Sequence, residues 1–178
     1  SPALPEHGAR TIVDVNRTVE SALMLTRGQI IERAKIVRCI EEVPPVLMDG
    51  GRLGQVVVNL LVNAAQAIPK EARGDHSVTI TTRSDGRTVE IAVCDTGQGI
   101  RERDLARIWT PFFTTKTPDV GTGLGLSISR EIIERAGGTM RVTSPAQGDL
   151  LARGSEFVIA LPVAGRHESV PPISSPLP

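Results

Sequence analysis

The order of hydrophobic and polar residues along the chain predicts helices separated by pairs of strands. In the helical segments apolar residues recur at helical spacing, which gives each segment an apolar side. Asn16 and Asp49 precede two of these segments, and their side-chain oxygens are expected to accept hydrogen bonds from the free amides of the first turn. Gly137 marks the end of a third helical segment. Helices are expected over residues 16–27, 49–68, 102–108 and 124–136.

Strand-like segments lie between these helices. Two of them are joined by Ser84-Asp85-Gly86, which is typical of a tight hairpin turn. In the last one, Phe157, Ile159 and Leu161 alternate with residues that face the other way. This order of elements predicts an α+β fold, a two-layer sandwich whose mixed, mostly antiparallel sheet is covered on one face by about three helices. Strands are expected over residues 34–42, 77–84, 87–95, 139–144 and 155–162.

The length of 178 residues is typical of one domain. We expect an irregular lead-in at residues 1–12, the folded domain at 13–163, and a tail or linker rich in proline and serine at 164–178. Within the domain, residues 96–123 are rich in glycine, threonine and proline. Irregular segments of this length in a compact domain are usually functional.

Composition excludes several classes of protein. Hydrophobic residues make up 40% of the chain, enough for a core, and Lys+Arg equal Asp+Glu at 20 each. This balance predicts no nucleic-acid partner and no membrane contact by the domain. The longest uncharged apolar run, Leu53–Pro69, contains Asn and Gln side chains and does not suit a membrane span. Cys39 and Cys94 form no metal-binding pattern, and reduced thiols are favoured over a disulfide.

The helix expected at 49–68 is apolar nearly all round. Val58 and Val62 lie opposite its main apolar stripe, so the helix is expected to be buried. Its amide side chains share one narrow stripe. Two interpretations stay open: a strip that faces solvent, or a neutral wall whose oxygens contact a metal or a phosphate. The main stripe comprises Leu53, Val56, Val57, Leu60, Leu61, Ala64 and Ile68, and the amides are Gln55, Asn59, Asn63 and Gln66.

Two glycine-rich turns complete the candidate chemistry. Asp95 ends its strand on the face that the helices should cover, and a buried carboxylate needs donors or a cation. In Thr96-Gly97-Gln98-Gly99 the backbone can approach a ligand, although such turns also occur without a site. Gly121–Leu126 opens a helix. Its backbone amides could bind an anion at the helix start, or its glycines could serve only to permit a tight turn. The latter segment is neither a dinucleotide-binding pattern nor a P-loop.

Together these segments resemble the ATP-binding domain of sensor histidine kinases, in the superfamily shared with gyrase, Hsp90 and MutL and on its nitrogen-sensor-like branch. The match runs in order from about Val13 to Pro162. Gly137-Gly138-Thr139 and Gly154-Ser155-Glu156-Phe157 match the family's usual ending. The family's motifs are matched by an N box at Gln55–Ala65, a first glycine box at Asp95–Ile100, an F box at Trp109–Lys116 and a second glycine box at Gly121–Ser127.

The resemblance implies a Bergerat-type ATP-binding fold with Mg²⁺ and ATP as cofactors. Asp95 would accept a hydrogen bond from the exocyclic amine of adenine, with Gly97 and Gly99 beside the ring. Asn63 would hold Mg²⁺, and Asn59 would assist nearby as a catalytic residue.

The same resemblance implies a mobile lid at about residues 113–122. Its Lys116, the second catalytic residue, would reach the terminal phosphates, while Gly123 and Gly125 would present backbone amides to them. The other residues implied at the ATP site are Ile100, Phe113, Thr115, Gly121, Thr122, Leu124, Leu126 and Ser155.

Some positions depart from the family pattern. In the ATPases of the superfamily the position of Asn59 is usually Glu, which activates water, so a neutral Asn favours phosphoryl transfer over hydrolysis. Many histidine kinases have Lys at Gln66 and an aromatic residue at Ala67. No segment matches the H box, since no histidine lies on an expected dimerising helix. The histidines are His7 in the lead-in, His76 at a strand start and His167 in the tail.

The resemblance therefore implies the catalytic domain of a protein histidine kinase. It would bind Mg-ATP and transfer the γ-phosphoryl group to a histidine on a separate dimerisation domain, from which the receiver domain of a response regulator would take it. Its location would be cytoplasmic, within a parent protein that is either soluble or membrane-anchored. Two alternatives stay open: an ATP-sensing or scaffold module without transfer, and a serine kinase of the anti-sigma type, whose lid normally lacks the run Pro111–Lys116.

Overall fold

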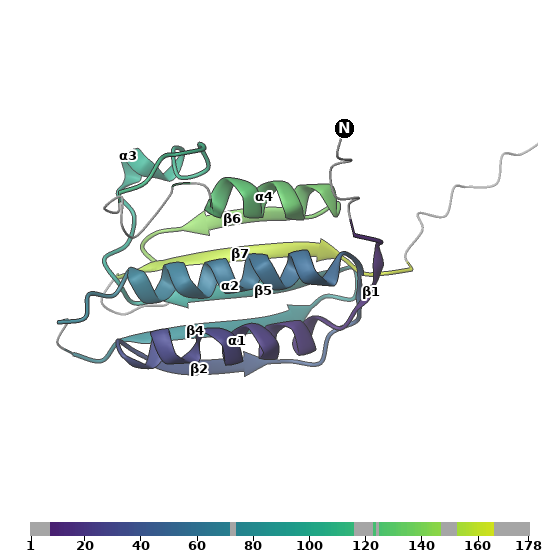
Figure 1. The fold of residues 1–178 in the computed structure, drawn as a ribbon, viewed down its shortest axis with the longest axis horizontal. Helices are drawn as coiled ribbons and strands as arrows, with labels where there is room; N and C mark the ends of the chain where they lie inside the picture. Colours follow the sequence, from purple (N-terminus) through teal and green to yellow (C-terminus); the bar gives the residue numbers. More distant parts are fainter. Residues whose placement is uncertain (1–7, 72–73, 116–122, 124, 147–152, 166–178) are drawn as a thin grey trace, which may run out of the picture.

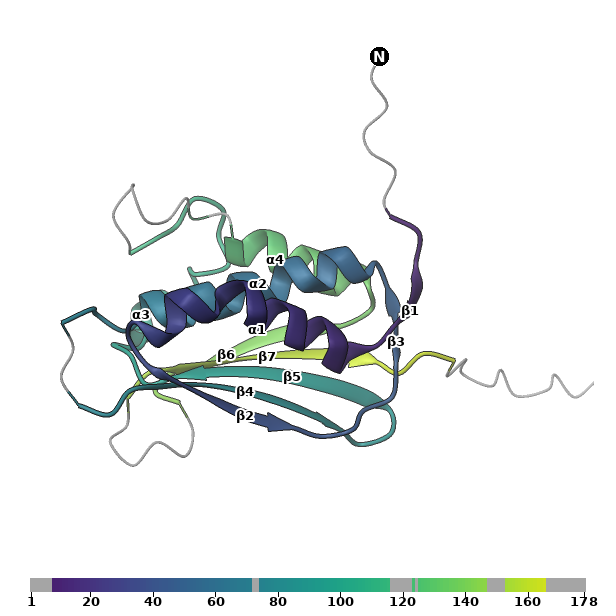
Figure 2. The same ribbon diagram turned by 60° about the horizontal axis from the view of Figure 1, so that its bottom comes forward.

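A computed structural model describes residues 8–71, 74–115, 123, 125–146 and 153–165 of the protein. Three helices lie in one layer, with α2 between α1 and α4, and cover one face of a five-stranded sheet (Figures 1 and 2). A short helix, α3, stands beside the layers (Figure 1). The helices are α1 (Val15–Ile31), α2 (Gly50–Gln66), α3 (Glu102–Leu105) and α4 (Gly125–Arg135).

The sheet has the strand order β2-β4-β5-β7-β6. Only the β2–β4 pair is parallel among these, and the other neighbours are antiparallel. The predicted α+β sandwich with a mixed, mostly antiparallel sheet is therefore confirmed. The strands are β2 (Lys35–Ile40), β4 (Ser77–Ser84), β5 (Thr88–Asp95), β6 (Thr139–Thr143) and β7 (Ser155–Pro162).

The core lies between the two layers. Leu53, Leu60 and Leu61 of α2 are at most 1% exposed and face Ile80 and Ile91 of the sheet's central strands. Burying a side chain of this kind stabilises the fold by about 1.5–3 kcal/mol. Asp49 caps α2 as predicted, because its carboxylate accepts hydrogen bonds from the amides of the first turn. The cap therefore fixes the start of α2, while its buried leucines pack the inner face against the sheet.

The prediction for the start of the first helix was wrong. Asp14, not Asn16, caps α1, since its side chain accepts a hydrogen bond from the amide of Arg17. The Asn16 amide instead donates to the carbonyl of Glu41 at 2.7 Å and accepts from the Thr82 hydroxyl at 2.8 Å. Asn16 therefore ties α1 to the sheet, a long-range contact that local sequence does not reveal.

A second, two-stranded sheet was not predicted. β1 (Thr11–Val13) pairs antiparallel with β3 (Val46–Met48) at one end of the sandwich (Figure 2). β1 begins within the segment expected to be irregular. Strands of three residues are too short to show an alternating pattern, so only their pairing defines them.

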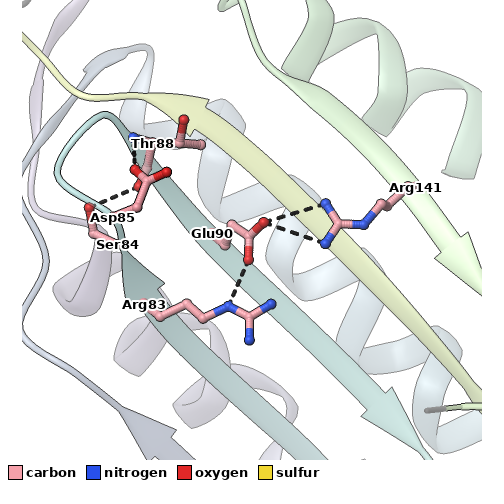
Figure 3. A network of polar contacts seen from close by, with 6 residues as sticks. All are labelled: Arg83, Ser84, Asp85, Thr88, Glu90 and Arg141. Atoms are coloured by element: carbon pink, nitrogen blue, oxygen red, sulfur yellow. Dashed lines mark hydrogen bonds and ion pairs between the residues drawn. The ribbon is translucent and has the colours of Figure 1, made fainter.

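The face of the sheet away from the helices carries a charged network (Figure 3). Glu90 of β5 accepts from Arg83 of β4 at 2.7 Å and contacts Arg141 of β6 at 3.4 Å, across β7. The hydrogen bond and charge of Glu90 raise the pKa of Arg83. In the predicted hairpin, the amides of Thr88 and Arg87 lower the pKa of Asp85, the side chain that closes the turn. Exposed ion pairs contribute about 0–1 kcal/mol each, so the network adds little to the stability of the fold.

Candidate functional site

The candidate site begins with a buried carboxylate at the end of β5. Asp95 is 3% exposed and faces the helix layer, as its strand parity predicts. Its carboxylate accepts hydrogen bonds from the amide of Gly97 at 2.8 Å and from the Ser155 hydroxyl at 3.0 Å. Asp95 and Ser155 are direct partners in the β5–β7 register. Such donors offset the cost of burying this group, and they fix the direction of the carboxylate oxygens.

The turn after Asp95 is packed against the end of α2. A side chain at Gly97 would bring its Cβ within 2.3 Å of the Ala67 carbonyl oxygen, so only glycine fits here. The amide of Gln98 donates to the same carbonyl at 3.0 Å. The first glycine box and the C-terminal end of the N-box helix therefore form one unit.

The segment between β6 and β7 supports this turn, and sequence reasoning missed it. The Ser144 hydroxyl accepts a hydrogen bond from the amide of Ile100 at 2.8 Å and donates to the Gly154 carbonyl at 2.9 Å. The amide of Gly154 donates in turn to the Gly97 carbonyl at 3.0 Å. Gly154 has φ +71°, and a Cβ there would lie 1.8 Å from the Asp95 carbonyl oxygen. Ser144 lies far from the glycine box in sequence and belongs to none of the four boxes, so its role appears only in the fold.

We expect Ser144→Ala to weaken ATP binding several-fold. The change removes two hydrogen bonds that hold the turn, and a typical bond contributes about 0.5–1.5 kcal/mol. Titration calorimetry with ATP measures the effect. Ser84→Ala is the matched control, because it removes a hydroxyl that also bonds two backbone groups, at the distant hairpin. Equal losses in both variants would contradict a role of Ser144 at the site.

A second cluster forms where α2 faces the start of α4. The Asn59 amide donates to the Ser129 hydroxyl at 3.2 Å. A Cβ on Gly125 would lie 2.6 Å from the Asn59 amide oxygen. Because Gly125 has no side chain, the Asn59 side chain can pack directly against the first turn of α4. The amide stripe of α2 therefore faces α4 at Asn59. Asn63 and Gln66, which continue the stripe, are half-buried, whereas Gln55 is exposed.

The F box lies beside the second glycine box. The amide of Phe112 donates to the Gly123 carbonyl at 2.9 Å, and a Cβ on Gly123 would lie 2.4 Å from the Phe112 carbonyl carbon. Phe112 itself has φ +67° and is 74% exposed. The Arg107 guanidinium stacks over the half-buried Phe113 ring at 4.5 Å from its centroid. Two motifs that are separate in sequence thus form one surface.

The remaining predicted site residues are placed as follows. Gly99 is half-buried beside Ser144, and Leu126 packs against the core. Thr115 is exposed at the end of the described F box. Lys116, Gly121, Thr122 and Leu124 lie outside the described residues.

The two clusters stand at different positions along one helix. Asn59 and Ala67 are eight positions apart, about 12 Å at the rise of an α-helix. The Asp95 cluster offers a buried carboxylate acceptor between small residues. The Asn59 cluster offers neutral side-chain amides next to the backbone amides at the start of α4. A buried, directional acceptor suits the amine of a base, and helix-terminal amides suit phosphates. Fold and site together define a nucleotide-binding α+β sandwich.

Comparison with known proteins gives the family. Residues 48–165 match the family described as histidine kinase-, DNA gyrase B-, and HSP90-like ATPase. The chain belongs to this family, whose domain binds ATP.

The curated relatives are sensor proteins. The chain is 38% identical over 162 residues to the sensor histidine kinase ZraS of Escherichia coli (strain K12), a match that covers 89% of the chain and 32% of ZraS. It is 42% identical over 122 residues to the sensor protein FixL of Bradyrhizobium diazoefficiens, which covers 68% of the chain and 23% of FixL. The chain thus spans about a third or less of the length of these relatives.

Solved structures share the fold. The catalytic domain of the histidine kinase ThkA superposes with a TM-score of 0.72 at 29% identity, covering 86% of the chain and 97% of that domain. Full-length ShkA in complex with AMPPNP gives a TM-score of 0.70 at 28% identity, covering 85% of the chain and 30% of ShkA.

In the described part of the chain, every helix is too short or too polar to cross a membrane.

Proposed function

We propose that the domain binds Mg-ATP and transfers the γ-phosphoryl group to a histidine on a separate helical domain, within two-component signalling. The observation that carries the proposal is the pair of clusters along α2. The buried carboxylate of Asp95 lies near the C-terminal end of α2, and the neutral amide of Asn59 lies near the middle of α2, against the glycine start of α4. The relatives, which are sensor histidine kinases, support the same function.

Asp95 binds the adenine end of the nucleotide in this proposal. The carboxylate is oriented by Gly97 and Ser155, so its acceptor oxygens point in fixed directions. An exocyclic amine suits such an acceptor, whereas a carbonyl at the same position would place two acceptors face to face. Gly97 and Gly99 lie beside the ring in this proposal, and their lack of side chains lets the turn pack closely against Ala67 and Ser144.

The phosphates lie at the other cluster. Gly123 and Gly125 present amides at the start of α4, where the helix dipole adds positive potential. The amide oxygens of Asn59 and Asn63 are hard ligands of the kind that suits Mg²⁺ shared with phosphates, and Asn63 is the proposed ligand. The bound ion would supply charge neutralisation at the phosphate oxygens. Lys116 is proposed to reach the terminal phosphate.

Asn59 favours transfer over hydrolysis. A carboxamide accepts no proton at neutral pH, so it cannot act as the general base that would activate water. Its amide is also hydrogen-bonded to Ser129, which holds it beside Gly125. During transfer the bond between the γ-phosphorus and the β–γ bridging oxygen breaks, a bond to the histidine nitrogen forms, and ADP leaves. Positioning and charge neutralisation suffice for this reaction.

We expect the 178-residue chain to bind ATP without phosphorylating itself on histidine. His76, the histidine within the described residues, is half-buried before β4 and its ring nitrogen lies 3.0 Å from the Thr96 hydroxyl. It is therefore held at the turn instead of on a helix that could approach the γ-phosphorus in line. Incubation with labelled ATP, followed by acid and base treatment, measures the phosphorylated product.

Adding the histidine-bearing segment of the parent protein as a separate chain should give acid-labile label on that segment. Acid-labile label on the chain alone, lost in a His7→Ala variant, would contradict the expectation. Label that survives acid would favour a serine kinase. ATP binding without transfer to the added segment would favour an ATP-sensing module.

A further inference from the structure

The C-terminal end of α2 is held by an arginine from outside the helix. The last turn of a helix leaves carbonyl groups without helical partners and carries partial negative charge. α2 has no basic residue in its own last turn. The half-buried Arg33, which lies between α1 and β2, supplies this charge instead. Its Nη1 donates to the Ile68 carbonyl at 2.9 Å and contacts the Ala65 carbonyl oxygen at 3.4 Å.

The turn that joins α1 to β2 fixes the backbone from which this side chain extends. The amides of Arg33 and Ala34 both donate to the Ile30 carbonyl, at 3.0 Å and 2.9 Å. Ile30 is fully buried, so the acceptor of these two bonds is itself held in the core. The guanidinium therefore reaches α2 from a rigid base. Its partners are backbone carbonyls of a remote helix, which no sequence motif records.

The same end of α2 carries the carbonyl that faces the turn after Asp95. In sequence, Ala67 lies between the two residues whose carbonyls contact Arg33. Its carbonyl accepts from the Gln98 amide at 3.0 Å, and a Cβ on Gly97 would lie 2.3 Å from its oxygen. The Gly97 amide in turn donates to the Asp95 carboxylate at 2.8 Å. Close-packed atoms transmit displacements, so a shift of the last turn of α2 moves a donor that orients Asp95.

The phosphate end of the site depends on other contacts. Asn59 lies nine positions before Ile68, about 14 Å at the rise of an α-helix. Its side chain is bonded to Ser129 of α4, and the adjoining Leu60 is fixed in the core. Loss of the Arg33 contacts therefore changes the base end of the site more than the phosphate end.

We propose that Arg33 is a positioning residue of the nucleotide site that sets the direction of Asp95 and thereby the preference for adenine, an inference that rests on the proposed function. The guanidinium fixes the last turn of α2, the Ala67 carbonyl fixes Gly97, and Gly97 fixes the carboxylate. Binding groups must be held within about 0.5 Å of the productive geometry by such supporting contacts. Arg33 supports the turn from the α2 side, as Ser144 does from the segment between β6 and β7.

Three variants of the 178-residue chain test the proposal. Arg33→Ala removes both contacts, and Arg33→Lys keeps a charged donor on a flexible stem. Arg38→Ala is the matched control, because the Arg38 guanidinium pairs with Glu20 and also ties α1 to the edge strand β2. Titration calorimetry with Mg-ATP and with Mg-GTP gives the Kd values. A ¹H–¹⁵N spectrum of the chain without nucleotide follows the amides of Gly97 and Gln98.

Arg33→Ala is expected to weaken ATP binding about three- to tenfold, because its effect passes through hydrogen bonds of ordinary strength. Its Kd for GTP should stay within about twofold of the wild type, since Asp95 offers the guanine carbonyl no donor. Arg33→Lys should fall between Arg33→Ala and the wild type. The amide signals of Gly97 and Gln98 should shift in Arg33→Ala and keep their positions in Arg38→Ala, which should bind ATP as the wild type does.

Unchanged ATP affinity and unchanged amide signals in Arg33→Ala would overturn the proposal. Equal losses for ATP and GTP would do so as well, because they would assign Arg33 to the stability of the fold alone. A loss of ATP affinity in Arg38→Ala as large as that in Arg33→Ala would lead to the same conclusion.

The outcomes separate this inference from the proposed function. A shifted Gly97 amide and a selective loss of ATP affinity, without any transfer to the histidine-bearing segment in the wild type, would support the positioning role and contradict the kinase activity. Transfer by the wild type, together with an unshifted Gly97 amide and unchanged ATP affinity in Arg33→Ala, would do the reverse.

Discussion

Asp95→Asn is expected to weaken ATP binding by about 1–3 kcal/mol, or roughly 5- to 150-fold, because a buried charged hydrogen bond is lost. The amide also turns one acceptor oxygen into a donor that faces either the Gly97 amide, the Ser155 hydroxyl or the base. Titration calorimetry with ATP and with GTP measures both affinity and base selectivity. The wild type should prefer ATP, and the variant should lose most of that preference.

Two controls accompany this measurement. Asp85→Asn makes the same chemical change at an exposed hairpin turn and should leave ATP affinity unchanged. Ser155→Ala removes one donor but leaves the carboxylate, so its effect should be smaller, about 1 kcal/mol. Equal affinity of the wild type for ATP and GTP would show that Asp95 does not read adenine.

The fold could be predicted closely because its main elements carry strong local patterns. α2 follows from Asp49 and a long apolar stripe, and the β4–β5 hairpin follows from Ser84-Asp85-Gly86. The errors have a common physical cause. Asn16 looks like a cap, but it is bonded to Glu41 and Thr82, and β1 exists only through its pairing with β3. Contacts between distant segments decide these cases, and local patterns do not encode them.

The candidate site could be predicted where its motifs are local. Asp95 and Gly97 are two positions apart in sequence, and the structure joins them by a hydrogen bond. The motifs do not reveal Ser144, which supports the first glycine box from the other side of β7. They also do not reveal that Gly125 must lack a side chain because of Asn59. Each of these facts depends on how two remote segments pack.

The expectation that α2 would be buried on all sides was wrong. Its all-round apolar pattern predicts burial, yet the helix layer of this chain covers only its inner and lateral sides. Val58 and Val62, on the opposite side, are therefore only half-buried.

Asn63→Ala is expected to lower phosphoryl transfer to the histidine-bearing segment at least about 100-fold. Charge neutralisation by a bound metal contributes several kcal/mol to such reactions, and each 1.36 kcal/mol changes the rate tenfold. Asn63 lies one helical turn beyond Asn59 on the half-buried stripe of α2, where its oxygen can reach a cation shared with the phosphates. Asn63→Asp should also be impaired, because it places a negative charge beside the phosphates.

A binding measurement distinguishes loss of a metal ligand from loss of structure. With Mg²⁺ present, ATP should bind Asn63→Ala more weakly than the wild type, and with Mg²⁺ removed by a chelator the two affinities should converge. The thermal midpoint should change little, since the side chain is only half-buried. Gln55→Ala, an exposed amide on the same helix, is the control and should keep the wild-type Mg²⁺ dependence. If Asn63→Ala transfers at the wild-type rate with the same Mg²⁺ dependence, the ion is held elsewhere and Asn63 serves the helix packing alone.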